Sequence, residues 1–183
     1  MALTVKETQA QALQMFEAEV TQADKEVLNK IEALLREVTG RGVSGKDFRM
    51  YTEDELSRIA GSMATLKVNL GEIMARADAS YRMNEEEIRI KMVGMRDAAM
   101  QKYTSEGKKY TQGDLNDYAE KHLFLYRALS VYKERHAKVV QNLWWSLKLL
   151  LEVMLKRIDV LQNQRSDSGA SKNGSLEYDI PQS

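Results

Sequence analysis

The sequence predicts an all-α protein: a long antiparallel helical hairpin with an additional N-terminal helix, coiled-coil-like and oligomeric. Three observations predict this fold. The one proline among the 183 residues is Pro181, so no proline interrupts the long segments before it. Within those segments apolar residues recur at steps of three and four, which is the period of one helical face. Hydrophobic residues make up 43% and charged residues 30% of the chain, a mix typical of long amphipathic helices.

An N-terminal helix is expected over residues 1–39. Thr4 and Glu7 have the spacing of a capping box, and one apolar face then runs from Leu13 to Val38. Three glycines follow within six residues, which predicts a glycine-rich linker over residues 40–51.

The hairpin is expected over residues 52–164. Its first helix begins at a second capping box, Thr52 and Glu55, and its apolar seam slips by about one residue near Tyr81 without a helix breaker. Residues 104–113 contain two glycines and predict the turn, so the second helix should begin near Asp114. The seam expected on that second helix, before a shift near Trp144, consists of Leu115, Tyr118, His122, Leu125, Leu129, Tyr132, His136, Val139 and Leu143. Residues 165–183 are small, polar and aperiodic, and we expect a disordered tail there.

Composition argues against several classes of protein. Zero cysteines remove disulfides, thiolate metal sites and cysteine nucleophiles. No segment is long and apolar enough to span a bilayer, and the N-terminus does not resemble a signal peptide. We therefore expect a cytoplasmic protein that does not contact a membrane.

Two patterns resemble chemical sites without completing one. Gly40 to Asp47 has the glycine and lysine spacing of a phosphate-binding loop, but Asp47 stands where Ser or Thr should ligate Mg²⁺, and no strand precedes it. His122 and His136 share a heptad phase and could bind metal or sense pH in an oligomer, although we interpret them as polar residues that set register. We expect no metal, no cofactor and no enzymatic activity.

Charge points to an anionic partner for the middle of the chain. Residues 1–80 carry 10 basic and 13 acidic side chains, whereas residues 81–165 carry 16 and 11. Basic residues there are interspersed with tyrosines and tryptophans, a combination that binds single strands because cations neutralise phosphates and aromatic faces stack on bases. The candidate nucleic-acid-binding residues are Arg82, Arg89, Lys91, Arg96, Lys102, Tyr103, Lys108, Lys109, Lys121 and Arg127. The alternative is that these residues serve as seam packing and interhelical salt bridges.

A longer pattern covers residues from about 81 to 165. A charged helix, Glu85 to Tyr103, closes on a polar turn that contains glycine, and tyrosines, a tryptophan pair and a basic closing helix follow. The residues of the second part are Asp114, Tyr118, Tyr126, Tyr132, Lys133, Trp144, Trp145, Leu149, Leu150, Met154, Lys156, Arg157, Ile158 and Leu161. This order of residue types resembles the UvsY-type recombination mediators of bacteriophages.

The resemblance implies a non-enzymatic phage protein of the host-cell cytoplasm that forms homo-oligomers. It implies binding to single-stranded DNA and assistance to a recombinase that replaces single-strand-binding protein on the strand. These functions belong to DNA recombination and repair. The alternative is a structural or chaperone-like coiled-coil assembly protein that does not bind nucleic acid.

Overall fold

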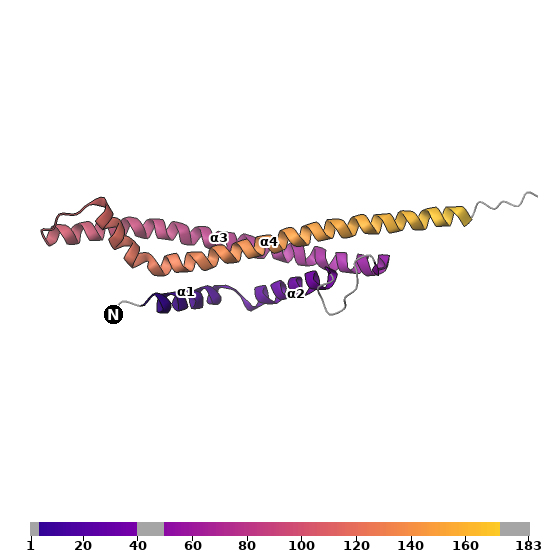
Figure 1. Cartoon of the computed structure of the whole chain (residues 1–183), viewed down its shortest axis with the longest axis horizontal. Coiled ribbons are helices and arrows are strands. Elements are labelled where there is room, and N and C mark those ends of the chain that lie inside the picture. The colour runs from indigo at the N-terminus through magenta and orange to yellow at the C-terminus, as the bar shows by residue number, and fades with distance from the viewer. Residues whose placement is uncertain (1–3, 40–49, 173–183) are drawn as a thin grey trace, which may run out of the picture. The chain divides into compact units, whose positions relative to one another are not determined.

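The computed structural model describes residues 4–39 and 50–172, and no β-strand occurs in these ranges. The helices are α1 (Val5–Glu19), α2 (Gln22–Val38), α3 (Glu53–Ser105) and α4 (Gln112–Lys172) (Figure 1). The all-α class is confirmed for this part of the chain, and α3 and α4 are the two long helices that the heptad pattern predicts. Over the same residues, no helix combines the length and the apolar character needed to cross a bilayer.

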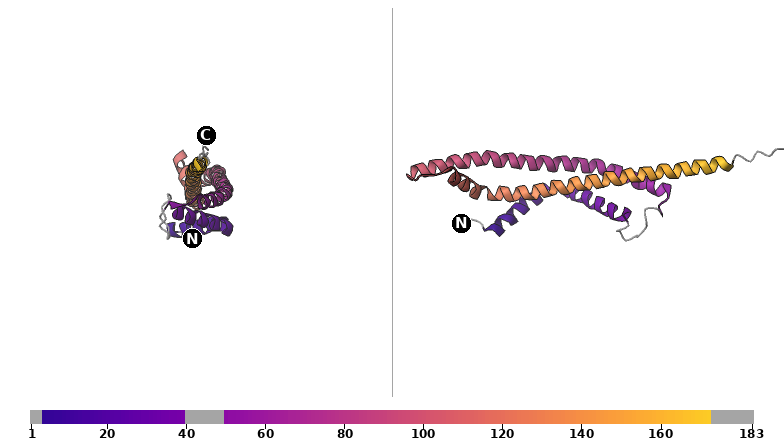
Figure 2. Two further views of the ribbon diagram at one scale, coloured as in Figure 1. Left: turned by 90° about the vertical axis from the view of Figure 1, so that its right-hand side faces the viewer. Right: turned by 45° about the horizontal axis from the view of Figure 1, so that its top comes forward.

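Packing divides the chain into two compact units. Unit 1 comprises Met1–Lys30 and Asn69–Trp144, and unit 2 comprises Ile31–Val68 and Trp145–Ser183. In unit 1, α3 and α4 run antiparallel, and α1 with the start of α2 packs on the pair (Figure 2). In unit 2, the end of α2, the start of α3 and the end of α4 enclose a core that includes Ile31, Leu56, Met63, Leu147 and Met154. All ten candidate nucleic-acid-binding residues belong to unit 1.

The turn between α3 and α4 is the one that its two glycines predict. Gly107 has φ +64°, the left-handed conformation that lacks a steric penalty only for glycine. The Lys108 N–H donates to the Tyr103 carbonyl at 2.9 Å, and the Gly107 N–H donates to the Thr104 carbonyl at 3.1 Å. This pair of bonds is the Schellman motif, which satisfies the last carbonyls of α3 and stops the helix.

Helix α4 begins with a reciprocal cap. The Thr111 N–H donates to Asp114 Oδ2 at 2.7 Å, and the Asp114 N–H donates to Thr111 Oγ1 at 3.3 Å. The Thr111 N–H and the Thr111 hydroxyl both donate to the Asp114 carboxylate and lower its pKa, because they favour the ionised form. The cap places the start of α4 two residues before the predicted start at Asp114.

The predicted seam of α3 is confirmed. Its helix continues without a break through the phase slip at Tyr81, which is half-buried. The apolar residues of this seam that the structure buries are Leu56, Ile59, Met63, Leu70, Ile73, Ala77, Ile88 and Ala99.

The predicted seam of α4 is confirmed in part: Leu115 and Leu129 are buried, and Tyr118, Leu125, Tyr132, His136 and Leu143 are half-buried. Two predicted members do not belong to the packed face. His122 and Val139 are exposed. The observed seam lies one residue further on and also alternates steps of three and four; its members are Ala119, Leu123, Tyr126, Ser130, Lys133, Ala137, Val140 and Trp144, all buried or half-buried. The physical reason is that α4 has two neighbours. This seam faces α3, where the Asn84 side chain donates to the Tyr126 carbonyl at 3.4 Å, whereas Tyr132 and His136 face Phe16 of α1.

The predicted single helix over residues 1–39 is also corrected, because the structure divides it into α1 and α2. Val20 is extended, with φ −81° and ψ 110°, and ends α1. The Thr21 hydroxyl then accepts the Asp24 N–H at 3.1 Å, which caps α2. The Thr-x-x-Asp spacing was present in the sequence, but the uninterrupted apolar face favoured one helix.

The boundaries outside the hairpin are settled in part. The Thr52 and Glu55 capping box is confirmed, with bonds of 2.8 and 3.3 Å, and α3 begins at Glu53. Helix α4 continues to Lys172, so residues 165–172 are helical instead of disordered. Most of the predicted linker, including the Gly40 to Asp47 loop, and residues 173–183 of the predicted tail lie outside the described residues.

Alanine substitutions at Gly107 and at Gly94 should change the free energy of unfolding in opposite directions. Gly107→Ala forces a side chain into a left-handed conformation and should lower the free energy of unfolding by about 1 kcal/mol. Gly94 lies inside α3 with no heavy atom within 4 Å of an added Cβ, so Gly94→Ala should raise that free energy by about 0.5–1 kcal/mol. Urea denaturation measures both, and a Gly107→Ala variant as stable as the parent would contradict the turn geometry.

Candidate nucleic-acid interface

Four of the candidate residues form one flank of α3. Arg82, Arg89, Arg96 and Tyr103 follow one another at intervals of seven. An α-helix falls about 20° short of two full turns in seven residues, so the flank rotates slowly about the helix axis. Burial increases along it: Arg82 and Arg89 are exposed, whereas Arg96 and Tyr103 are half-buried. The flank therefore approaches α4 as it nears the turn.

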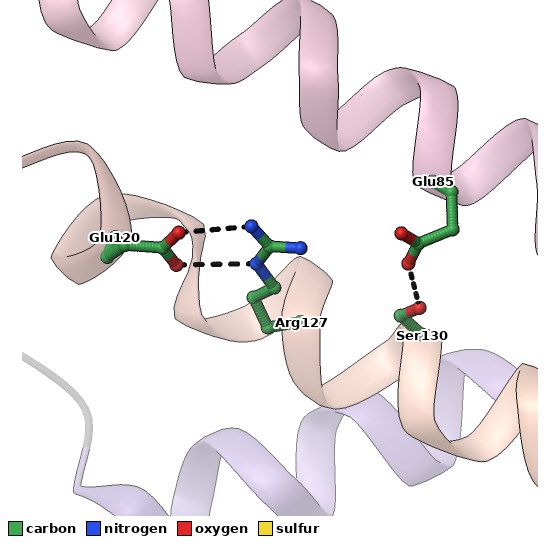
Figure 3. A network of polar contacts seen from close by, with 4 residues as sticks. All are labelled: Glu85, Glu120, Arg127 and Ser130. Atoms are coloured by element: carbon green, nitrogen blue, oxygen red, sulfur yellow. Dashed lines mark hydrogen bonds and ion pairs between the residues drawn. The ribbon is translucent and has the colours of Figure 1, made fainter. Parts of the chain in front are cut away.

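Three arginines meet at an open hollow between α3 and α4. Arg89, Arg96 and Arg127 line it together with Glu85. The Arg127 guanidinium binds Glu120 through two bonds of 3.0 and 3.3 Å, and Glu120 raises the pKa of Arg127 (Figure 3). The Ser130 hydroxyl donates to Glu85 across the helix pair (Figure 3). Arg96 Nε is buried and has no hydrogen-bond partner within the described residues, so a donor at this hollow remains to be satisfied.

Aromatic rings gather at the turn end of unit 1. The Tyr103 ring stacks on Tyr110 with centroids 5.9 Å apart and meets the Tyr118 ring edge-on at 6.5 Å. The Tyr118 ring also stacks on His122 at 4.2 Å, and Lys102 Nζ lies 5.5 Å from the Tyr118 centroid. We call Tyr103, Tyr110, Tyr118 and His122 the aromatic tip. Tyr110 and His122 are exposed, so the tip offers ring surface to solvent.

Three of the four tip residues, Tyr110, Tyr118 and His122, are not among the ten candidate residues. The His122 Nδ1 lies 2.7 Å from the Tyr118 carbonyl, and since a carbonyl only accepts, Nδ1 carries the proton. Tyr110 follows the Schellman turn and therefore returns to the end of α3. Tyr110 was missed because its contact with Tyr103 depends on the turn geometry, whereas Tyr118 and His122 are a pair four residues apart on α4. The predicted turn itself was the signal that could have found Tyr110.

The remaining candidates are dispersed, and most are paired with carboxylates. Arg82 contacts Asp78 at 2.9 Å, and Lys108 contacts Glu106 at 2.7 Å. The Nζ atom of Lys91 lies 3.3 Å from Glu87 Oε1 and 4.7 Å from the centroid of the Tyr126 ring. Both residues raise the pKa of Lys91, Tyr126 more than Glu87.

Two lysines remain without such a partner. Lys109 and Lys121 are exposed, and neither makes an ion pair in the portion of the chain that the structure describes. Exposed ion pairs of the kind made by Arg82 and Lys108 are weak because water screens them, so phosphate oxygens can compete for those two cations.

Lys133 is one of the basic residues of α4, but it does not lie at the hollow or at the aromatic tip. Its side chain is 10% exposed, and Nζ contacts Glu19 of α1 at 2.9 Å. Lys133 and Glu19 line a small cavity of about 160 Å³ together with Asp24, Arg76 and His136. Burial lowers the pKa of His136, and the charge of Asp24 opposes that shift.

The described residues hold no group of three or more His, Cys, Asp or Glu side chains that could bind a metal ion. Comparison of the chain with protein-family models, with curated proteins and with solved structures finds no match.

His136 should make the stability of the protein depend on mild acid. Its pKa is lowered in the folded chain, so the unfolded chain binds the proton more readily. The stability from neutral His136 is therefore present above its ordinary pKa of 6.5 and is lost as the pH falls below that value. Urea denaturation at pH 7.5 and 5.5 should show a larger loss for the parent than for His136→Gln. Because the carboxylates are common to both proteins, an equal loss in the two would contradict this assignment.

Proposed function

We propose that this chain is a non-enzymatic protein that binds single-stranded DNA through the turn half of unit 1. The observation that carries the proposal is the aromatic tip, where Tyr103, Tyr110, Tyr118 and His122 lie beside Lys102. Sequence-tolerant binding of single strands combines stacking on aromatic rings with cations that track the backbone. The tip supplies the rings, and the arginine hollow behind it supplies the cations.

The spacing along α3 suits a strand that runs from the hollow to the tip. Arg89, Arg96 and Tyr103 are separated by seven residues each, which is about 10 Å along a helix. Arg127 adds a third guanidinium at the hollow, and Arg96 keeps a donor without a partner. In this arrangement phosphates bind at Arg89 and Arg96 while bases stack at Tyr103 and Tyr110.

The biological role that we propose is that of a recombination mediator in the host-cell cytoplasm. It rests on the resemblance of residues 81–165 to the UvsY-type proteins of bacteriophages. In that role the partners are a recombinase and a single-strand-binding protein. A chain with equal numbers of basic and acidic residues, 27 of each, holds a strand by moderate forces and can release it to the recombinase.

A homo-oligomer completes the proposal, and unit 2 supports it. Helix α4 buries Leu147 and Met154 on one face of this unit. On the opposite side, three large apolar side chains follow one another at steps of four. They are Trp145, Leu149 and Val153, which are 53%, 64% and 45% exposed. An apolar stripe of this kind is typical of a helix with another subunit against it. Several subunits would turn weak individual sites into avid binding along a strand.

The same stripe favours the alternative, a structural or chaperone-like assembly protein without affinity for nucleic acid. The two functions differ at the tip and the hollow, which a scaffold does not need.

The binding proposal predicts salt-sensitive association with labelled oligothymidine. The triple variant Arg89→Ala, Arg96→Ala, Lys102→Ala should bind roughly 10- to 100-fold more weakly at low salt. The slope of log affinity against log salt concentration should become shallower by about 2, because each of the three lost phosphate contacts contributes about 0.7. Fluorescence anisotropy at 50 and 200 mM salt measures both quantities.

The matched control for that triple variant removes three charges elsewhere. Lys30, Arg36 and Lys156 are exposed and lie outside the proposed interface, so their replacement by alanine should change affinity little. Absence of parent binding at low salt would contradict the function and favour the assembly protein. Equal weakening by both triple variants would contradict the interface.

The oligomer is tested by mass in solution. Leu149→Lys places a charge on the exposed stripe and should shift the parent oligomer towards monomer. Leu155→Lys is the control, because Leu155 is 48% exposed but does not lie on the stripe of Trp145, Leu149 and Val153. Sedimentation equilibrium measures the masses, and a monomeric parent would contradict the proposed assembly.

A further inference from the structure

The N-terminal part of unit 1 makes two ion pairs with the hairpin. We call α1 and α2 up to Lys30 the N-terminal arm. Glu19 at the end of α1 contacts Lys133 Nζ at 2.9 Å and accepts the Ser80 hydroxyl proton at 2.9 Å. Asp24 in the first turn of α2 contacts Arg76 at 2.6 Å. The break between the two helices therefore carries two carboxylates, and each is directed at a cation of the hairpin.

An aromatic contact lies beside these ion pairs. The Phe16 ring stacks on Tyr132 with centroids 6.2 Å apart and meets His136 edge-on at 5.3 Å. One short segment of the arm thus contacts two hairpin cations, a histidine and a tyrosine. They are the same kinds of side chain that form the proposed DNA-binding surface, here occupied by the chain's own carboxylates.

The burial of Lys133 and its pairing with Glu19 indicate the role of the arm. It lies on the seam of α4, where an apolar residue would pack without cost, and its side chain is 10% exposed. A buried ammonium requires a counterion, and Glu19 is the one that it has. A carboxylate and a phosphate present the same charged oxygen acceptors to an ammonium, so a nucleic-acid phosphate is an equivalent partner.

The arm has few apolar contacts to hold it. Within this part of the chain the buried residues are Thr8 and Ala12, whereas Val5, Leu13 and Met15 are exposed. An isolated helix of 15 residues is marginal in water, so α1 depends on its contacts with the hairpin. Segments with little apolar burial open at low free-energy cost.

We propose that the N-terminal arm is a self-inhibitory cover over a second DNA-binding surface, in which Glu19 and Asp24 occupy the places of two phosphates. The covered surface consists of Tyr132, Lys133 and His136, and Arg76, whose side chain is 58% exposed, lies at its edge. This inference rests on the proposed function, because the ligand that displaces the arm is the same single strand. When a strand takes the two cations, the arm leaves, and the strand is held at both the tip and the covered surface.

The first experiment removes the two carboxylate charges in the full chain. Glu19→Gln with Asp24→Asn keeps the shape of both side chains and should tighten oligothymidine binding roughly 10-fold. The salt dependence should become steeper by about 1.4, which corresponds to two added phosphate contacts at about 0.7 each. The control is Glu17→Gln with Glu26→Gln, which removes two exposed charges from the same two helices and should leave affinity nearly unchanged.

The second experiment releases the arm without changing any charge. Phe16→Ala removes the stacking contact and should also tighten oligothymidine binding, whereas Met15→Ala, at an exposed position next to it, should not. In parallel, acetylation followed by mass spectrometry reports whether Lys133 becomes reactive in the Phe16→Ala and Gln/Asn variants.

The outcomes separate the inference from the proposed function. Tighter binding with a more reactive Lys133 supports the cover. A more reactive Lys133 without tighter binding overturns the inference and leaves DNA binding at the tip in place. An unreactive Lys133 with unchanged affinity overturns it as well. If the parent and all variants fail to bind oligothymidine, both the inference and the proposed function are overturned.

Discussion

Helix α4 of unit 1 contacts two neighbours, and Lys133 lies where those contacts meet. Towards α3 it presents a regular three-four seam through Leu123, Ser130 and Val140. Towards α1 it presents Tyr132 and the residues beside it. Lys133 lies on the seam by its position, but its counterion comes from α1. Because an unpaired buried ammonium is costly, the seam and the docking of α1 depend on each other.

The same pairing of α3 with α4 creates the proposed interface. Gly107 reverses the chain within a few residues, so the last turn of α3 and the first turns of α4 lie side by side. Tyr103 from one helix and Tyr118 from the other can then share one cluster with Tyr110 of the turn. The heptad drift of α3 brings Arg96 towards α4 in the same region. Rings and cations that are far apart in sequence meet because the seam sets the register.

Local signals in the sequence predicted much of this fold, and signals that depend on two partners did not. Thr52 caps its helix and Gly107 turns the chain as expected, since both act on the backbone nearby. The seam of α4 that faces α3 lies one residue beyond the predicted seam, because the most apolar stripe of α4 packs against α1 as well as α3. In the site, the arginine flank followed from spacing alone. The bond between Glu120 and Arg127 did not, because those residues are seven apart and the usual helical pairs are three or four apart.

Photochemical cross-linking tests most directly whether single-stranded DNA binds at the aromatic tip. Ultraviolet irradiation of the parent protein with oligothymidine at low salt, followed by proteolysis and mass spectrometry, identifies the residues that contact the bases. We expect adducts on Tyr103 or Tyr110, with a yield that falls as salt is raised. Adducts confined to unit 2, for example at Trp145, or no adduct at low salt would contradict binding at the tip.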